Sequence, residues 1–435
     1  MSPFAHLVNR AGAIGNRLRF DRNEISGAFG DLGTSLPLLA GMILASGLNG
    51  GTVLIVFGLL LIGTGLYYGL PMPVQPLKMV AVLVIAQNIQ GPVLLGAGLA
   101  IGLLMLLLTA TGAVGWIARA VPEAVIRGIQ FGLGLQLARL ALFRYIPSEG
   151  ARGWALAAAG LAVALPLLGN RKYPPTLFVI GLGAAYAALF TAGFPAFSHS
   201  PGLTLPRFSL PSGSDMWVGL FLLAIPQVPL SIGNSILATH RIGRDYFPDR
   251  APGLERIGFT YGVMNLAAAL FGGVPVCHGS GGMAGHHALG GRTGGSVVIY
   301  GSLILGAGLL CSGNFAAFAW FFPLPILGVL LLVEGLALMK LMRGVLHSPF
   351  ELALAEGVGL CAAFLPYGYL IGLTAGTAAY HLAGRAGRDF LTMAPRPKRS
   401  TTVFQGSDPQ REPEVTSAPG PAVPSPPWLE AVIRK

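Results

Sequence analysis

The hydrophobic residues of this chain fall into long runs, separated by short breaks that are rich in glycine, proline or charge. Apolar runs of about 20 residues are long enough to cross the ~30 Å hydrocarbon core of a bilayer as helices. VLIVFGLLLIGTGLYYGL, LFVIGLGAAYAALFTAGF and FPLPILGVLLLVEGLALM are three examples. The pattern predicts an all-α polytopic membrane protein.

The spacing of the runs predicts about fourteen transmembrane helices. The first seven are expected to start near residues 25, 51, 74, 92, 122, 152 and 175. The second seven are expected to start near residues 214, 256, 275, 295, 315, 348 and 365. The chain is thereby divided into an N-terminal segment 1–22, a seven-span repeat 23–213, a second seven-span repeat 214–385 and a tail 386–435.

Basic residues support this count, because the cytoplasmic loops of membrane proteins carry an excess of lysine and arginine. An N-terminus on the cytoplasmic side places most of them inside: Arg10, Arg17, Arg19, Arg22, Arg119, Arg171, Lys172, Arg241, Arg244, Arg250, Arg256, Lys340, Arg343, Arg385 and Arg388. Only Arg144, Arg152 and Arg207 are then expected outside. We therefore expect both termini to be cytoplasmic. The tail contains MAPRPKRSTT and PGPAVPSPP and is expected to be flexible, without a folded regulatory domain.

Composition agrees with a membrane protein and weakens other classes. Of 435 residues, 53% are hydrophobic and 10% are charged, whereas an ordinary soluble domain has roughly 25% charged residues. The net charge of +11 is explained by basic loops on one side of a membrane, and no nucleic-acid partner is expected. The three cysteines lie in or beside apolar segments and show no disulfide framework. The first 30 residues show no cleaved signal peptide.

The two halves show weak internal similarity. The stretches PMPVQPLKM (71–79) and GVPVCHGSG (273–281) share a Pro-Val pair at a separation of 202 residues, and Gly30-Asp31 and Gly233-Asn234 are 203 residues apart. Because each half has an odd number of spans, the second half would enter the membrane upside down. The sequence therefore predicts two inverted seven-helix repeats.

Each repeat has a short third span that begins at a proline and contains polar residues. We expect residues 73–90 and 275–290 to form broken half-helices whose N-termini face each other near the bilayer centre. Interrupted helices at matching positions of two repeats mark the binding site of many transporters. Two helix N-termini that face each other carry unpaired N–H groups and partial positive charge, which suits an anion.

The candidate site follows from the side chains around these two helix N-termini. Glycine allows close approach of backbone N–H groups, serine, histidine and glutamine supply donors, and an intramembrane lysine supplies a cation. The predicted substrate-binding residues are Thr34, Gln75, Lys78, Asn234, Ser235, Cys277, His278, Gly279, Ser280 and Gly281. Asp31 either carries a coupling proton or forms a structural pair with Lys78.

The stretches NEISGAFGDLGTSLPLL (23–39) and GGVPVCHGSGGMAGHHALGGRTGGSVV (272–298) resemble the molybdate transporter family of the sulfate-permease superfamily. The similarity in span pattern covers about residues 20 to 385. The resemblance implies a core domain of spans 1–4 and 8–11, a gate domain of spans 5–7 and 12–14, and high-affinity molybdate uptake. The expected place is the inner (plasma) membrane of a bacterium, with molybdate and the lipid bilayer as partners.

Several alternatives stay open at this stage. Sulfate and tungstate are dianions of the same shape as molybdate and are alternative substrates. A passive anion channel of the same fold is the main rival mechanism. Whether the chain forms a homodimer, and which ion is coupled to transport, are undecided. An intramembrane hydrolase using Ser280 and nearby histidines is a remote alternative, so we expect no enzyme. His286 and His287 lack a ligand set at metal-binding spacing, so neither a metal nor a cofactor is expected. Glu334 is read as a structural contact in the gate domain, and Glu24 as part of the start of the first helix.

Overall fold

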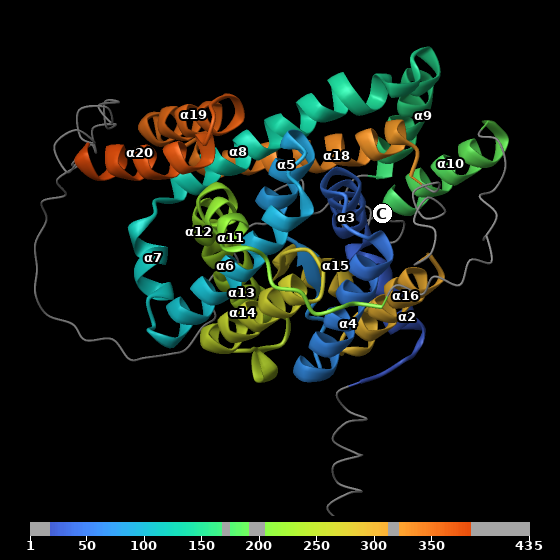
Figure 1. The fold of residues 1–435 in the computed structure, drawn as a ribbon, viewed down its shortest axis with the longest axis horizontal. Coiled ribbons are helices and arrows are strands. Elements are labelled where there is room, and N and C mark those ends of the chain that lie inside the picture. Colours follow the sequence, from blue (N-terminus) through green and yellow to red (C-terminus); the bar gives the residue numbers. More distant parts are fainter. Residues whose placement is uncertain (1–17, 168–174, 191–204, 312–321, 384–435) are drawn as a thin grey trace, which may run out of the picture. The chain divides into compact units, whose positions relative to one another are not determined.

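A computed structural model describes residues 18–167, 175–190, 205–311 and 322–383. These ranges are almost entirely helical (Figure 1). The predicted tail 386–435 and most of the predicted N-terminal segment 1–22 lie outside the described residues. The only strands in the described part are two three-residue segments.

The elements of the first half start close to the predicted span starts. The first span is broken into α2 (Arg22–Ala28), a 3₁₀ turn η1 (Phe29–Asp31) and α3 (Leu32–Ser46). There follow α4 (Gly50–Tyr68), β1 (Val74–Pro76), α5 (Lys78–Gln87), α6 (Gly91–Ala110), α7 (Val114–Ala120), α8 (Glu123–Leu140), η2 (Ala141–Tyr145), η3 (Ile146–Glu149), α9 (Ala151–Leu167) and α10 (Pro175–Phe190).

The second half repeats this order. Its first span runs through α11 (Gly213–Gly219), η4 (Leu220–Ala224), α12 (Ile225–Leu230), a π-helical turn η5 (Ser231–Leu237) and α13 (Ala238–Tyr246). There follow η6 (Pro248–Arg250), α14 (Leu254–Leu270), β2 (Val276–His278), α15 (Ser280–Ala288), α16 (Gly295–Cys311), α18 (Leu324–Met339), η7 (Lys340–Val345), α19 (Pro349–Phe364) and α20 (Gly368–Leu382). The expected start near 315 lies outside the described residues, and the next described helix begins at Leu324.

The main contacts between a helix of the first half and a helix of the second half have equivalent contacts in which the two halves exchange roles. In the first half, α4 packs on α16, and its counterpart α14 packs on α6. Likewise α8 packs on α19, and α18 packs on α9. β1 and β2 are antiparallel, and Gln75 lies opposite Cys277 at the centre of the register. An antiparallel pair of equivalent strands requires a two-fold axis perpendicular to them, so the two repeats are inverted, as the sequence predicted.

The helices form two packed groups (Figure 1). The core group contains α2 to α6 and α11 to α16, and the gate group contains α8 to α10 and α18 to α20. In Figure 1 the gate helices α8, α9, α18, α19 and α20 lie along the top of the view, above α3 and α15, and α5 reaches up to their level. The gate group has a hydrophobic cluster of its own, built from residues of α8, α9, α10 and α18. These groups match the core and gate domains implied by the family resemblance.

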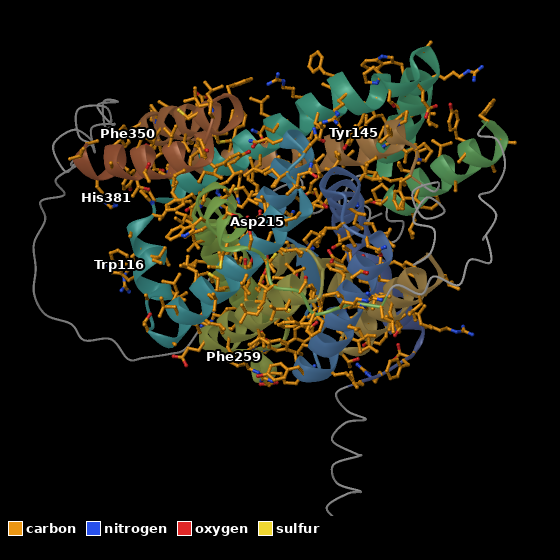
Figure 2. The ribbon with its side chains drawn as sticks, viewed as in Figure 1. Trp116, Tyr145, Asp215, Phe259, Phe350 and His381 are labelled. Atoms are coloured by element: carbon orange, nitrogen blue, oxygen red, sulfur yellow. The ribbon has the colours of Figure 1, made fainter. Side chains whose placement is uncertain are left out.

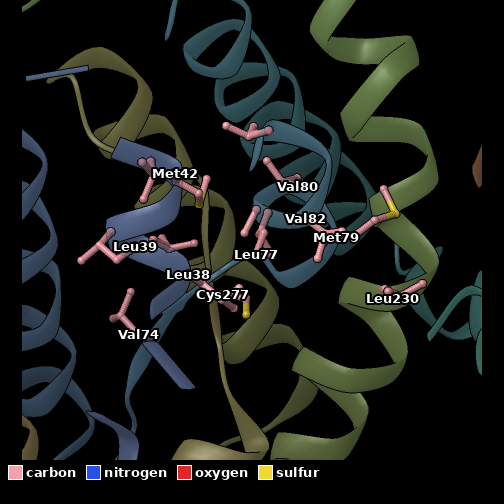
Figure 3. Packing of buried hydrophobic residues seen from close by; sticks show 14 of the residues in the cluster. Leu38, Leu39, Met42, Val74, Leu77, Met79, Val80, Val82, Leu230 and Cys277 are labelled. Atoms are coloured by element: carbon pink, nitrogen blue, oxygen red, sulfur yellow. The ribbon is translucent and has the colours of Figure 1, made fainter. Parts of the chain in front are cut away.

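The interrupted helices cross in the most buried part of the core group. Figure 3 shows side chains of α3, β1, α5, α12 and β2 gathered around the crossing: Leu38, Leu39, Met42, Val74, Leu77, Met79, Val80, Val82, Leu230 and Cys277. Each is at most 6% exposed. Burial on all sides fixes the position of the two strands, and therefore of the helices that start directly after them.

Glycines bring backbones into direct contact beside this crossing. A Cβ atom added to Gly30 in η1 would overlap the backbone of Gly285 in α15, and the reverse is also true. Gly282 of α15 is as tightly placed, because an added Cβ would lie 2.7 Å from Pro73 Cγ and 2.8 Å from Asp31 Cγ. Close approach therefore explains Gly30, Gly282 and Gly285 better than backbone conformation does.

Glu24 has a role that the sequence did not indicate. It was expected to help start the first helix, but Asp21 is the residue that caps α2. The Glu24 side chain is buried and accepts three backbone hydrogen bonds, from Arg292 N and Thr293 N at 2.9 Å and from Ser296 N at 3.0 Å. One carboxylate from the first repeat thus caps α16 of the second repeat.

Four helical segments of the described chain are long and apolar enough to cross a membrane, and a fifth arises if α2 and α3 form one bent span. The four are Gly50–Tyr68, Gly91–Ala110, Gly213–Tyr246 and Leu324–Val345. Several other apolar helices are shorter, and the count of fourteen stays a prediction. Large apolar side chains such as Trp116 and Phe259 point outward from the helices, 66% and 54% exposed (Figure 2), as expected of surfaces that contact lipid.

The Glu24 cap gives a first prediction. Glu24→Ala leaves two buried N–H groups and one half-buried N–H group without an acceptor and is expected to lower the free energy of unfolding by about 2–4 kcal/mol. Asn49→Ala removes the exposed N-cap of α4, where Asn49 accepts from Thr52 N at 2.9 Å, and should cost only about 0.5–2 kcal/mol. Thermal unfolding of the purified variants in detergent measures the difference. Equal shifts for the two variants would contradict the role assigned to Glu24.

Candidate anion-binding site

A cavity of about 450 Å³ lies where the two interrupted helices begin. The core group contributes residues from β1, α5, α12, η5, β2 and α15, and the gate group contributes residues from α8, α18 and η7. The lining residues are Gln75, Leu77, Lys78, Arg127, Gln130, Gln227, Leu230, Gly233, Asn234, Ser235, Ala238, Cys277, Gly279, Ser280, Gly281, Leu338 and Leu341. Eight of the ten predicted substrate-binding residues are among them.

Both half-helices open into this cavity with uncapped N-termini. α5 starts at Lys78 after Leu77, α15 starts at Ser280 after Gly279, and neither preceding residue makes a side-chain cap hydrogen bond. The N-termini of α2 and α4, by contrast, are capped by Asp21 and Asn49. The first N–H groups of a helix have no partner within it. Two sets of such donors, with the positive ends of two helix dipoles, therefore meet at one cavity.

Gly279 and Gly281 differ in their surroundings. A Cβ atom on Gly279 would overlap the side-chain amide of Gln75, so this position has to be glycine for the two half-helices to approach. A Cβ atom on Gly281 would meet no atom within 4 Å, because that position faces the open cavity. One glycine is required by packing, and the other leaves room for a ligand.

Asp31 holds the Gln75 side chain in place. Gln75 Nε2 donates to Asp31 Oδ1, and Ser35 Oγ donates to Asp31 Oδ2 at 2.7 Å. Asp31 is fully buried and does not line the cavity. One donor of the Gln75 amide is therefore used inside the protein, and Asp31 acts on the cavity through Gln75.

Lys78 has a different partner from the one expected. The sequence suggested a pair with Asp31, but Lys78 Nζ lies 2.5 Å from Glu334 Oε1, a residue of α18 in the gate group. No ion pair joins Lys78 to Asp31 in the described part of the chain. Asp31 is instead bonded to Gln75 and Ser35, and Glu334 is the carboxylate that Lys78 reaches.

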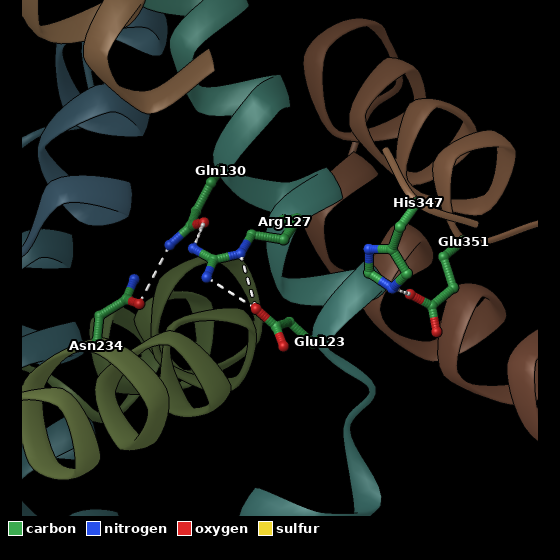
Figure 4. Close-up of polar contacts among 6 residues, drawn as sticks. All are labelled: Glu123, Arg127, Gln130, Asn234, His347 and Glu351. Atoms are coloured by element: carbon green, nitrogen blue, oxygen red, sulfur yellow. Dashed lines mark hydrogen bonds and ion pairs between the residues drawn. The ribbon is translucent and has the colours of Figure 1, made fainter. Parts of the chain in front are cut away.

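A second polar contact joins the two groups across the cavity (Figure 4). Gln130 Nε2 of α8 donates to Asn234 Oδ1 of η5 at 3.1 Å. Gln130 Oε1 accepts from Arg127 Nη1 at 3.1 Å, and Arg127 is held by Glu123 one turn earlier on α8, with Nη2 to Oε1 at 2.8 Å. The gate group therefore brings a second cation to the cavity wall, already paired with a carboxylate.

Comparison with known proteins decides the family. A family model described as "Molybdate transporter of MFS superfamily" matches residues 23–137 and 219–338. The chain is 33% identical over 383 residues to molybdate transporter 2 of Arabidopsis thaliana, which covers 76% of this chain and 81% of that protein. This chain belongs to the molybdate transporter family. Molybdate transporter 1 of Arabidopsis thaliana is 32% identical, over 74% of this chain and 79% of that protein.

Solved structures place this molybdate transporter family member in a known fold. The transmembrane domain of a cyanobacterium bicarbonate transporter, BicA, superposes with a TM-score of 0.58 at 18% identity, over 81% of this chain and 97% of that chain. Murine Slc26a9, an anion transporter in the inward-facing state, superposes with a TM-score of 0.61 at 15% identity, over 83% of this chain and 68% of that chain. The fold predicted from the sequence, that of the sulfate-permease superfamily, is confirmed.

One predicted site residue of this family member, His278, is not found at the cavity. His278 is fully buried behind it, where Nε2 contacts Thr260 Oγ1 at 2.8 Å and the ring packs edge-on against Tyr68. His278 follows Cys277 in β2, and successive side chains of a strand point to opposite faces, so only one of the two can face the cavity. Thr34 lies in α3, but its side chain is outside the described part.

Three polar residues that line the cavity escaped the sequence analysis: Arg127, Gln130 and Gln227. Arg127 and Gln130 lie on α8, in the run EAVIRGIQFGLGLQLARL, whose charged residues signal a helix facing water or a partner. Gln227 is buried next to the cavity and donates to Ser231 Oγ at 3.1 Å. Polar residues within apolar runs were the available signal. Among the described residues, no group of three potential metal ligands is present.

The two glycines give the second prediction. Gly279→Ala forces the Gln75 amide away from Asp31, so we expect a loss of about 1–3 kcal/mol in the free energy of unfolding, as for other overpacked sites. Gly281→Ala has open space and removes a helix-weakening glycine, so its stability should be unchanged or higher by up to about 1 kcal/mol. Thermal unfolding of both variants is the measurement. A stable Gly279→Ala protein would show that the approach of Gln75 is looser than the structure indicates.

Proposed function

We propose that the chain is a secondary transporter that takes up a tetrahedral oxyanion, molybdate in the first place. The anion would lie between the N-termini of α5 and α15. The observation that carries this proposal is that two uncapped helix N-termini open into one cavity of about 450 Å³ beside a lysine. Such a site offers convergent N–H donors and positive charge without a carboxylate among its lining residues.

The residues proposed to contact the anion come from both repeats. Lys78 and the first N–H groups of α5 approach from one side, and Gly279, Ser280 and Gly281 from the other. Asn234, Ser235 and Cys277 complete the core side of the wall, and Thr34 is retained as a prediction from the sequence. Gln75 and Asp31 are proposed to orient the site, and His278 to support β2 from behind.

The choice of molybdate rests on the relatives, whose names describe molybdate transporters. Sulfate and tungstate have the same charge and tetrahedral shape, so hydrogen-bond donors alone distinguish them poorly. A cavity of about 450 Å³ leaves room for any of the three together with water. Competition between these anions for one site is therefore expected.

We propose alternating access as the mechanism. The cavity lies between the core group and the gate group, and two polar contacts cross it, Lys78 to Glu334 and Gln130 to Asn234. Movement of one group against the other would break these contacts and expose the anion to the opposite side. A passive anion channel with this fold is the rival mechanism, and it needs no such movement.

The proposed setting is a membrane with both termini in the cytoplasm. The repeats 23–213 and 214–385, the tail 386–435 and the distribution of arginine support this orientation. The inner membrane of a bacterium is retained as the proposed place, although the relatives described above are plant proteins. A homodimer and a coupling ion stay predictions.

The third prediction concerns transport itself. Purified protein in liposomes is expected to take up labelled molybdate with saturation, and preloading the vesicles with unlabelled molybdate should accelerate entry. Sulfate, tungstate, bicarbonate and uracil, added one at a time as competitors, define the substrate class. Flux that rises linearly with concentration and shows no acceleration by internal molybdate would favour the channel. Inhibition by bicarbonate or uracil alone, without inhibition by sulfate or tungstate, would contradict a site for a tetrahedral dianion.

The fourth prediction concerns Ser280. Its hydroxyl is the side-chain donor nearest the N-terminus of α15, and a hydrogen bond to a charged group contributes roughly 1.5–3 kcal/mol. Ser280→Ala should therefore weaken molybdate binding about tenfold, since ~1.4 kcal/mol is a factor of ten. Ser302→Ala is the matched control, because Ser302 is exposed on α16 and donates to its own helix at Val298 O. Calorimetric titration with molybdate should show full affinity for the control; an unchanged Ser280→Ala protein would remove this hydroxyl from the site.

A further inference from the structure

The ion pair of Lys78 and Glu334 differs from the other ion pairs of the described chain. The pairs Arg127–Glu123 and His347–Glu351 each join residues four apart within the gate group. Lys78 belongs to α5 of the core group and Glu334 to α18 of the gate group, 256 residues later. Among the described residues, this is the ion pair that joins the two groups whose relative movement the proposed mechanism requires.

The pair lies where an anion in the cavity would reach it. Lys78 is a lining residue, and its side chain is 34% exposed, whereas that of Glu334 is 13% exposed. Leu338 and Leu341 line the cavity one and two turns after Glu334 on the same face of the α18–η7 segment. An entering anion therefore meets the ammonium group of Lys78 from the open side while Glu334 holds it from the gate side.

Charge counting shows what the pair does to the site. Glu334 neutralises Lys78, and Glu123 neutralises Arg127, so the two cations of the cavity wall are already matched. A dianion would then find helix N-termini but no uncompensated cation. A lysine ammonium has three donors, but a carboxylate and a dianion bound to it together would repel each other strongly in a partly desolvated cavity. Binding of the dianion to Lys78 and binding of Glu334 to Lys78 therefore oppose each other.

We propose that Glu334 is a built-in competitor of the transported anion. Its carboxylate occupies Lys78 while the site is empty, and the anion displaces it, which frees α18 of the gate group from α5 of the core group. The inference rests on the proposed function and adds to it the step by which substrate binding permits movement. Glu334 is a positioning residue in this scheme, since it acts on the anion through Lys78.

The proposed competition predicts that removing the charge of Glu334 strengthens molybdate binding. Glu334→Gln removes the competing charge but keeps the shape of the side chain, so molybdate should bind about tenfold tighter, which corresponds to ~1.4 kcal/mol. Lys78→Met should lose most of the affinity, and adding Glu334→Gln to it should restore none. A carboxylate that only supported the fold would give the opposite result, namely lower stability and weaker binding in Glu334→Gln.

The experiment is calorimetric titration of the purified full-length protein with molybdate, with a thermal unfolding curve for each variant. Glu351→Gln is the matched control, because Glu351 forms an ion pair in the same gate group away from the cavity; its affinity should equal that of the wild type. Glu334→Asp, which keeps the charge but shortens its reach, should bind with intermediate affinity. It is the second test should Glu334→Gln not fold.

The outcomes separate this inference from the proposed function. Wild-type protein that is folded but binds no molybdate, sulfate or tungstate overturns the proposed function itself. Wild-type protein that binds, together with folded Glu334→Gln and Glu334→Asp proteins that bind equally or more weakly, overturns only the competition. Tighter binding by Glu334→Gln that persists in the double variant with Lys78→Met would also overturn it, because the gain would not pass through Lys78.

Discussion

The fold depends on one constraint, which is that a backbone interrupted at membrane depth must still find partners for its polar groups. The chain meets it by pairing the two interruptions with each other, since β1 and β2 form an antiparallel ladder centred on Gln75 and Cys277. Leu77 N donates to Pro275 O at 3.0 Å. The Asn265 side chain accepts from Val276 N at 2.9 Å through Oδ1 and donates to Val276 O at 2.7 Å through Nδ2. The groups left over are the first N–H groups of α5 and α15, and these face the cavity. These donors are the groups on which the proposed anion site depends.

The same crossing shows how the repeats relate to each other. Equivalent strands that pair antiparallel define a two-fold axis between them, which agrees with the inverted repeats expected from an odd number of spans in each half. The family model names the MFS superfamily, whose two halves are related by an axis along the membrane normal. The inverted relation and the likeness to BicA and Slc26a9 place the fold of this chain with the sulfate permeases instead. The family assignment is unaffected, because it rests on sequence similarity to molybdate transporters.

Local features of the sequence were sufficient for much of the fold and of the cavity. Pro73 and Pro275 interrupt the helical pattern, and the Pro-Val pair that both stretches share indicated the repeat. Lys78 and Ser280 were therefore correctly placed near the starts of two helices. Contacts between distant residues were beyond such reasoning. Nothing in LLLVEGLALMK indicates that Glu334 reaches Lys78, and nothing in NEISG indicates that Glu24 caps α16. His278 is the clearest example of what the sequence could not predict. Whether its side chain faces the cavity or the core depends on the three-residue strand β2, and the surrounding glycine-rich sequence does not predict a strand.

The packing within each group and between the groups differs in a way that bears on movement. Within the core group, glycines set backbones in direct contact, as between Gly58 and Gly301 or Gly30 and Gly285, and within the gate group Gly134 and Gly335 do the same. Contacts of this kind tolerate little sliding, because atoms have no free space to move into. Across the cavity, the groups meet through long side chains, Lys78 with Glu334 and Gln130 with Asn234, which can exchange a protein partner for an anion or water. The groups also share apolar contacts, because one hydrophobic cluster contains Val80 of α5 together with Ile129 of α8 and Leu331 of α18. The polar side chains at the cavity are therefore one part of what the proposed movement would have to break.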